Sequence, residues 1–172
     1  QFKQTDKRFM TGVNASHTLL GNWAGHDVEN TLGTQVRNDQ TQVGLFKTVN
    51  RRILSTTRLD DVDEASAGFY YENVFHWTDT FRTIAGVRED EYMGSVHSNL
   101  AANSGSTRDR MVSPKLGLVL GPWSRTEYYA NWGRGFHSND ARGATITVDP
   151  SDGTTPQSKV PLLVQVSGTE LG

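Results

Sequence analysis

The sequence predicts an all-β fold, built as an antiparallel up-and-down meander of about eight strands. Through most of the chain apolar and polar residues alternate with a period of two, as they do in strands whose two faces meet different surroundings. The helical spacing of apolar residues is nowhere sustained, and glycine interrupts most candidate helices. The expected connections are alternately long and short. These observations favour strands that each pair with the next one in the chain.

The alternation defines eight expected strands. In chain order they cover residues 6–20, 29–37, 42–49, 62–77, 81–97, 110–120, 125–137 and 161–171. The first sets Phe9, Val13 and Leu19 on the face opposite polar or small residues. The fourth alternates most clearly, because between Glu64 and Trp77 its odd-numbered positions are apolar or aromatic except for Asn73. The sixth and seventh divide in the same way, whereas Ile84 falls on the polar side of the fifth.

The connections between these strands point to a barrel in a membrane. They are expected at Gly21–Val28, Asn38–Thr41, Asn50–Asp61, Thr78–Thr80, Ser98–Asp109, Gly121–Ser124 and Ser138–Val160. Long and short connections alternate without exception, and outer-membrane barrels have short turns at one rim and long external loops at the other. Aromatic residues near the short turns fit an interfacial girdle. They are Phe75, Trp77, Phe81, Trp123 and Tyr128. The sequence therefore predicts part of a larger transmembrane β-barrel.

The composition excludes several classes of function. The 172 residues carry 17 Lys and Arg against 19 Asp and Glu, and this net charge of −2 argues against a nucleic-acid partner. The absence of cysteine excludes a disulfide scaffold and a cysteine-ligated metal site. No apolar run approaches the ~18 residues of a membrane helix, but hydropathy leaves membrane strands open. The chain opens on Gln1 without a signal peptide and closes inside an expected strand, so we expect a piece of a longer protein.

No motif in the chain points to catalysis. Gly133-Arg134-Gly135 lacks the pattern and the strand–helix context of a phosphate loop, and no serine lies in a nucleophile elbow. The five histidines have no metal-ligand spacing. The acidic cluster between Asp60 and Glu64 lacks the central glycine of a calcium loop and is expected at a solvated loop edge, and residues 103–107 are expected to form a flexible loop tip. We expect no enzyme, no cofactor and no metal site.

Several strings of residues resemble a known family. Residues Ser113–Val119, Gly121–Trp123, Glu127–Asn131 and Gly133–Gly143 together resemble the β-barrel of a TonB-dependent outer-membrane receptor. The closing residues Gly168–Gly172 are similar to the start of another strand of such a barrel. The resemblance covers nearly the whole chain, and its most specific part is Phe136–Gly143. The family's plug domain and TonB box have no counterpart in these residues, so residues 1–172 are expected to form a partial barrel domain.

The resemblance implies a transport function. It implies TonB-energised uptake of a scarce ligand, such as an iron chelate, across the bacterial outer membrane. The partners would be outer-membrane lipid, the plug domain of the same parent chain, the TonB complex reached through that plug, and a small-molecule ligand. Within the barrel, one face of the strands would meet lipid. The residues predicted to do so are Ala67, Phe69, Tyr71, Leu116, Leu118, Tyr128, Ala130 and Trp132.

Two sets of polar residues are candidates for function. The first set shares the polar face and is predicted to face the lumen: Arg82, Arg88, Asp90, Lys115, Glu127 and Tyr129. Pairing across strands and with the plug would explain these residues, and so would a polar path for the ligand. The second set is predicted to lie at the external rim and to hold the ligand or gate its entry: Arg134, His137, Asp140 and Arg142. Three of these four can instead pair with one another and fold the loop back onto the rim.

Two other classes of protein share this pattern. One is a soluble small-ligand-binding β-barrel that closes on its own eight strands, and the other is a surface β-domain acting in adhesion. A soluble carrier has its apolar face inside, whereas a membrane barrel reverses this arrangement. Alternation alone does not tell inside from outside, so the family-like strings and the rhythm of the connections favour the receptor.

Overall fold

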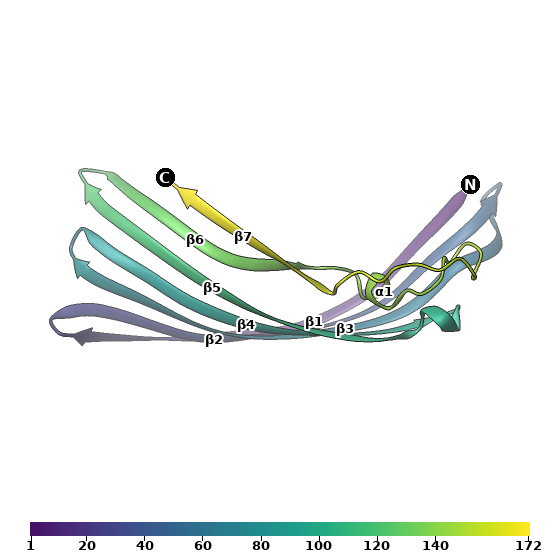
Figure 1. Cartoon of the computed structure of the whole chain (residues 1–172), viewed down its shortest axis with the longest axis horizontal. Coiled ribbons are helices and arrows are strands. Elements are labelled where there is room, and N and C mark those ends of the chain that lie inside the picture. The colour runs from purple at the N-terminus through teal and green to yellow at the C-terminus, as the bar shows by residue number, and fades with distance from the viewer.

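A computed structural model describes residues 1–172 as one open, curved sheet of seven antiparallel strands (Figure 1). The strands are neighbours in chain order: β1 (Phe2–Trp23), β2 (His26–Val49), β3 (Arg52–Thr78), β4 (Phe81–Ser98), β5 (Gly105–Trp123), β6 (Thr126–Ser138) and β7 (Leu163–Leu171). The two helices are short, η1 (Ala101–Asn103) and α1 (Ala141–Thr145). No helix is long and apolar enough to cross a membrane. The predicted all-β antiparallel meander is confirmed.

The strand β2 is continuous where the sequence suggested two strands. The expected connection Asn38–Thr41 is wrong, because each of its residues has a partner on both β1 and β3. Asn and Asp favour turns in isolation, but here Arg37 Nε donates to both carboxylate oxygens of Asp39 at 3.0 Å. That pairing allows a buried Asp39 to remain in the sheet.

The next expected connection, Asn50–Asp61, is also wrong. β2 and β3 are joined by the two residues Asn50 and Arg51, whose φ angles are 49° and 65°. Positive φ at both central residues is the signature of a tight hairpin turn, which matches the right-handed twist of the flanking strands. The residues expected in a long loop therefore extend β3 instead.

Because β2 is continuous, the connections between strands fall into two groups, one at each end of the sheet. Two-residue turns join β1 to β2, β3 to β4 and β5 to β6, and we call their end of the sheet the short-turn rim. The opposite end, the loop rim, carries the Asn50–Arg51 turn, residues 99–104 with η1, and residues 139–162 with α1. The expected long connection Gly21–Val28 is a two-residue turn. The long connection after β6 is present.

The strand register gives the sheet two different faces. Residues 139–162, the β6–β7 connection, lie inside the curve of the sheet (Figure 1). Ala141 of this connection packs against Val62 and Val96, so even-numbered residues of β3 and β4 face the concave side. Odd-numbered β3 residues such as Phe69 and Tyr71 therefore face the convex side.

The register continues this division onto β5 and β6. Leu116 pairs with Trp132, and Leu118 pairs with Ala130. Through Ala85 and Thr83 these residues share the face of Asn73 and Phe75 on β3. The eight residues predicted to meet lipid thus share the convex face.

The sheet has little apolar core of its own. Only 20 of 172 residues are buried, and many large apolar side chains of the convex face are exposed, including Phe69 at 66% and Leu116 at 56%. A contiguous apolar surface of this kind needs an apolar partner. β1 and β7 form the two edges and do not pair with each other, so the seven strands do not close into the small soluble barrel that the sequence left open.

Candidate functional site

Aromatic rings line the convex face at the short-turn rim. Ring centroids lie 5.9 Å apart for Trp23 and Phe75, 4.3 Å for Phe75 and Trp77, and 6.3 Å for Trp77 and Phe81. The Trp77 indole N–H donates to the Thr83 hydroxyl at 2.9 Å. Rings with an apolar body and a satisfied polar group are typical of the boundary between lipid and water.

The apolar part of the convex face has a defined height. Along β3 it runs from Trp77 to Phe69, nine residues in the sequence, with Asn73 as the one polar residue on this face. A tilted strand needs about 9–11 residues to cross the hydrocarbon core of a bilayer. At the level of Phe69 and Ala67 the face changes to ion pairs, Glu89 with Arg110 and Glu91 with Arg108. This belt therefore has the height of a membrane.

The six polar residues predicted to face the lumen all lie on the concave face. Arg82 pairs with Glu127 at 3.1 Å, and Arg88 pairs with Asp90 at 2.6 Å. Lys115 forms an ion pair with Glu72, and the Tyr129 hydroxyl donates to Glu170 at 3.1 Å. The structure thus pairs each of the six within the sheet.

The sheet is not continuous along the whole length of β5 and β6, because the two strands separate on the side of the loop rim. Pairing of these strands begins at the short-turn rim and ends at Lys115 and Gly133. The next β5 residue is Pro114, which has no N–H to extend the ladder. Beyond that point β6 pairs only with β7, and Phe136 packs edge-on against Tyr92 of β4 at 5.5 Å. β6 therefore turns onto the concave face and carries the β6–β7 connection with it.

The connection is docked through the start of α1. Ala141 is fully buried against Val62 and Val96, and its N–H donates to Glu64 Oε1 at 3.0 Å. A Cβ at Gly94 would lie 2.7 Å from the Cβ of Ala141, so only glycine leaves room for this approach. Because Gly94 and Ala141 are both small, the backbone of the β6–β7 connection can approach β4 closely.

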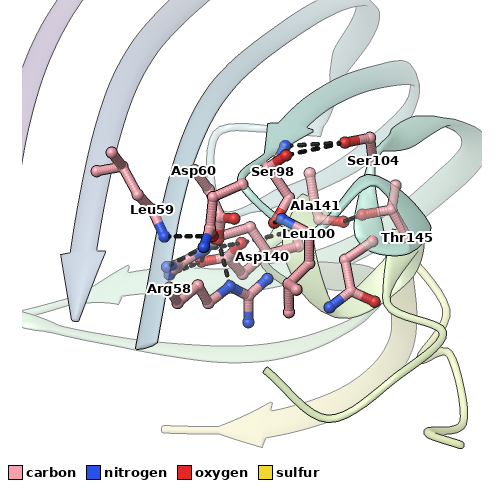
Figure 2. Close-up of polar contacts among 12 residues, drawn as sticks. Arg58, Leu59, Asp60, Ser98, Leu100, Ser104, Asp140, Ala141 and Thr145 are labelled. Atoms are coloured by element: carbon pink, nitrogen blue, oxygen red, sulfur yellow. Dashed lines mark hydrogen bonds and ion pairs between the residues drawn. The ribbon is translucent and has the colours of Figure 1, made fainter. Parts of the chain in front are cut away.

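Charged groups surround the same contact (Figure 2). Asp60 is fully buried, pairs with Arg58, and lies 4.0 Å from Arg142. Arg142 also pairs with Asp140 at 2.6 Å, and Asp140 caps α1 by accepting from the Arg142 backbone N–H at 2.8 Å. Burial opposes the ionisation of Asp140, but hydrogen bonds from Arg142 outweigh it and hold the pKa of Asp140 below its usual value. Asp60 is therefore not at the solvated edge expected for this acidic cluster, whereas Asp61 and Asp63 are exposed, but within β3 and not in a loop.

A second anchor comes from Asn103, at the end of η1. Its side-chain amide donates to the Val148 carbonyl at 2.9 Å, and its Oδ1 accepts from the N–H groups of Thr147 and Val148 at 2.9 and 3.0 Å. Asn103 is fully buried. The expectation of a flexible loop tip at residues 103–107 was therefore wrong, because these residues form the end of η1 and the start of β5.

The four residues predicted at the external rim lie apart from one another, except for one pair. Asp140 and Arg142 pair with each other in α1 and its cap. Arg134 and His137 are exposed on β6, and the guanidinium carbon of Arg134 lies 5.9 Å from the Trp132 ring centroid. Arg134 does not join the Asp140–Arg142 pair.

Sequence reasoning missed the residues that dock the connection, although one signal was present. Arg and Asp stand two positions apart in β2, β3 and β4, at Arg37–Asp39, Arg58–Asp60 and Arg88–Asp90. In a strand this spacing places both side chains on one face. All three pairs lie on the concave face as ion pairs, with the aspartates at 7%, 0% and 1% exposure.

Two cavities with charged residues in their lining lie on the concave face. One, of about 280 Å³, lies against the connection and is lined by groups that include Arg37, Asp39, Glu64 and Asn139. The other, of about 510 Å³, is lined by Arg88, Lys115 and Arg134 among others. No group of three His, Asp or Glu residues is placed to hold a metal ion. These cavities can offer charged and hydrogen-bonding groups, and nothing in them forms a catalytic arrangement.

A sheet with an apolar convex belt and an ion-paired concave face defines a segment of a transmembrane β-barrel wall. The family model described as TonB dependent receptor-like, beta-barrel matches residues 1–161, and the chain belongs to this family. No curated protein sequence matches the chain.

Two solved structures share this fold. The ferric citrate transporter FecA in its unliganded form aligns with a TM-score of 0.71 and 12% identity, over 78% of this chain and 21% of that one. The copper transporter OprC aligns with a TM-score of 0.62 and 12% identity, over 98% of this chain and 28% of that one. The chain therefore spans less than a third of the length of either transporter.

The close contact between Gly94 and Ala141 predicts that one methyl group added at position 94 weakens the docking of the β6–β7 connection. Gly94→Ala should loosen the connection by about 1–3 kcal/mol, because the added Cβ overlaps Ala141. The measurement is the rate of limited proteolysis within residues 146–158 of the folded full-length protein. Gly105→Ala is the matched control, since its Cβ would meet Thr145 at an ordinary 3.7 Å. Equal cleavage rates in both variants would contradict the docked arrangement.

Proposed function

We propose that this chain is part of the barrel wall of a bacterial outer-membrane receptor that imports a scarce ligand with energy from the TonB complex. The observation that carries the proposal is the belt of the convex face, which has the height of a bilayer and an aromatic rim. Family membership and the likeness to two transporters support it. The protein acts as a transporter and receptor and not as an enzyme.

The proposal gives the sheet an orientation. The short-turn rim faces the periplasm and the loop rim faces outward, as in outer-membrane barrels generally. Residues 1–172 are then a partial barrel domain, and the unpaired edges of β1 and β7 pair with further strands. The concave face meets the lumen and the plug domain of the same parent protein, and the TonB complex acts through that plug.

The ligand is proposed to be a small molecule such as an iron chelate, which is consistent with the ferric citrate that FecA transports. Arg134 and His137 are its stronger contacts, because they are exposed and free of carboxylate partners. Asp140 and Arg142 act less directly, by holding the connection on the concave face. Arg134 lines the same cavity as Lys115 and Arg88, and these charged groups offer the ligand a path inward.

A charge in the apolar belt should destabilise the barrel. Leu118→Arg in the full-length protein should lower the free energy of unfolding by roughly 2–4 kcal/mol, since Leu118 lies within the belt. Val112→Arg, which lies beside the ion pairs at the end of the belt, should lower it by only roughly 0–1 kcal/mol. The measurement is reversible urea unfolding in lipid vesicles. Equal effects at the two sites would contradict the placement of the belt in lipid.

Removal of the connection should impair uptake. Asn139 N–H donates to the Leu162 carbonyl at 2.7 Å, so Asp140–Pro161 can be replaced by a two-residue Asn-Gly turn that keeps this last rung. Uptake of radioactive iron as ferric citrate, and binding of ferric citrate to the purified protein, should both fall. Gel mobility of the unheated protein checks barrel assembly. An assembled, trimmed barrel with unchanged binding and uptake would contradict a role of the connection in ligand capture.

A further inference from the structure

A groove crosses the convex face at the loop-side end of the apolar belt. It has a volume of about 640 Å³ and runs over β1 to β5. Most of its lining is apolar: Ala15, Leu32, Phe69, Tyr71, Val87 and Val112. The small residues Ala15 of β1 and Gly33 of β2 are part of this lining, whereas Phe69 and Tyr71 are 66% and 40% exposed. The groove is thus a shallow, open depression beside exposed rings, on the face that the proposed function places in lipid.

One end of the groove is charged. Glu89 lines it and pairs with Arg110, and the next pair on the same face is Glu91 with Arg108. The arginine side chains are 64% and 70% exposed, against 46% and 31% for the carboxylates, so the guanidinium groups are outermost. No other ion pair involves either guanidinium. A guanidinium can bind a carboxylate with part of its fork and a phosphate with the rest.

The backbone around the groove excludes a peptide as the occupant. The groove strands β2, β3 and β4 have paired neighbours on both sides, so they offer no free N–H or C=O groups. A peptide lying there would leave its own backbone unsatisfied in an apolar setting. A hydrocarbon chain has no such groups to satisfy.

We propose that the groove holds one acyl chain of an anionic membrane lipid, whose phosphate is bound by Arg108 and Arg110. The inference rests on the proposed function only in that the convex face meets lipid. The chain follows the hollow between the rings, and the headgroup lies at the level where the belt ends. The site would make this part of the wall selective for anionic lipid.

The test uses the full-length protein in phosphatidylcholine vesicles with a trace of spin-labelled phosphatidylglycerol or spin-labelled phosphatidylcholine. Electron spin resonance measures the lipid immobilised on the protein. The unmodified protein should immobilise both lipids, with an excess of phosphatidylglycerol. Ala15→Trp fills the groove and should lower the affinity for phosphatidylglycerol by about tenfold. Ala85→Trp, on the same face outside the groove, is the matched control and should retain the excess.

A second pair of variants tests the headgroup without changing the net charge. Arg110→Gln combined with Glu89→Gln, and Arg108→Gln combined with Glu91→Gln, should each remove most of the excess. No excess in the unmodified protein, or an excess that survives Ala15→Trp and both double variants, would overturn the lipid site. No immobilised lipid of either kind would instead contradict the proposed function, so the two failures are distinguishable.

Discussion

The backbone ladder between consecutive strands is the constraint on which the rest of this structure depends. Of 114 backbone hydrogen bonds, 100 lie within the helices and strands, and few side chains are buried. Because side chains alternate across each strand, the register alone decides which residues meet the convex side and which meet the concave side. A slip by one residue would exchange Leu118 with Val119 and place Lys115 or Glu127 in the apolar belt. The ladder and the two-faced pattern therefore support each other.

After the backbone ladder, ion pairs between side chains of the concave face contribute most to the arrangement of the sheet. The repeated Arg-x-Asp spacing puts each aspartate beside its own arginine within one strand, so three nearly buried carboxylates are neutralised locally. Removing one partner of such a pair typically costs about 3–5 kcal/mol, since the other charge is left buried and unpaired. At Asp60 this arrangement serves a further purpose, because Arg142 approaches the same carboxylate and joins the wall to the β6–β7 connection.

The sequence was informative where the alternation was regular and where contacts were local. The strands from Ala65 to Trp132 and their two faces could be predicted, because apolar residues alternate with polar or small ones over most of their length, with exceptions such as Asn73 and Ile84. β2 was divided in error, since Asn38 and Asp39 favour turns, and the sequence did not reveal that Arg37 on the same face balances the charge of Asp39. The docked connection could not be predicted, because it depends on Ala141 meeting Gly94, residues far apart in the chain. The place of Pro114 at the end of the β5–β6 ladder became meaningful only once the register was known.

The most direct test of the two-faced membrane sheet is the accessibility of spin labels placed one at a time from Ala67 to Trp77 in the full-length protein in lipid vesicles. Collision rates with oxygen, which concentrates in lipid, and with a water-soluble nickel complex are measured at each position. The structure predicts a period of two over the whole segment, with high oxygen collision rates at the six odd-numbered positions from Ala67 to Trp77, Asn73 included, and low rates at the even-numbered positions between them. Equal rates at neighbouring positions, or high oxygen rates at the even-numbered positions, would contradict it.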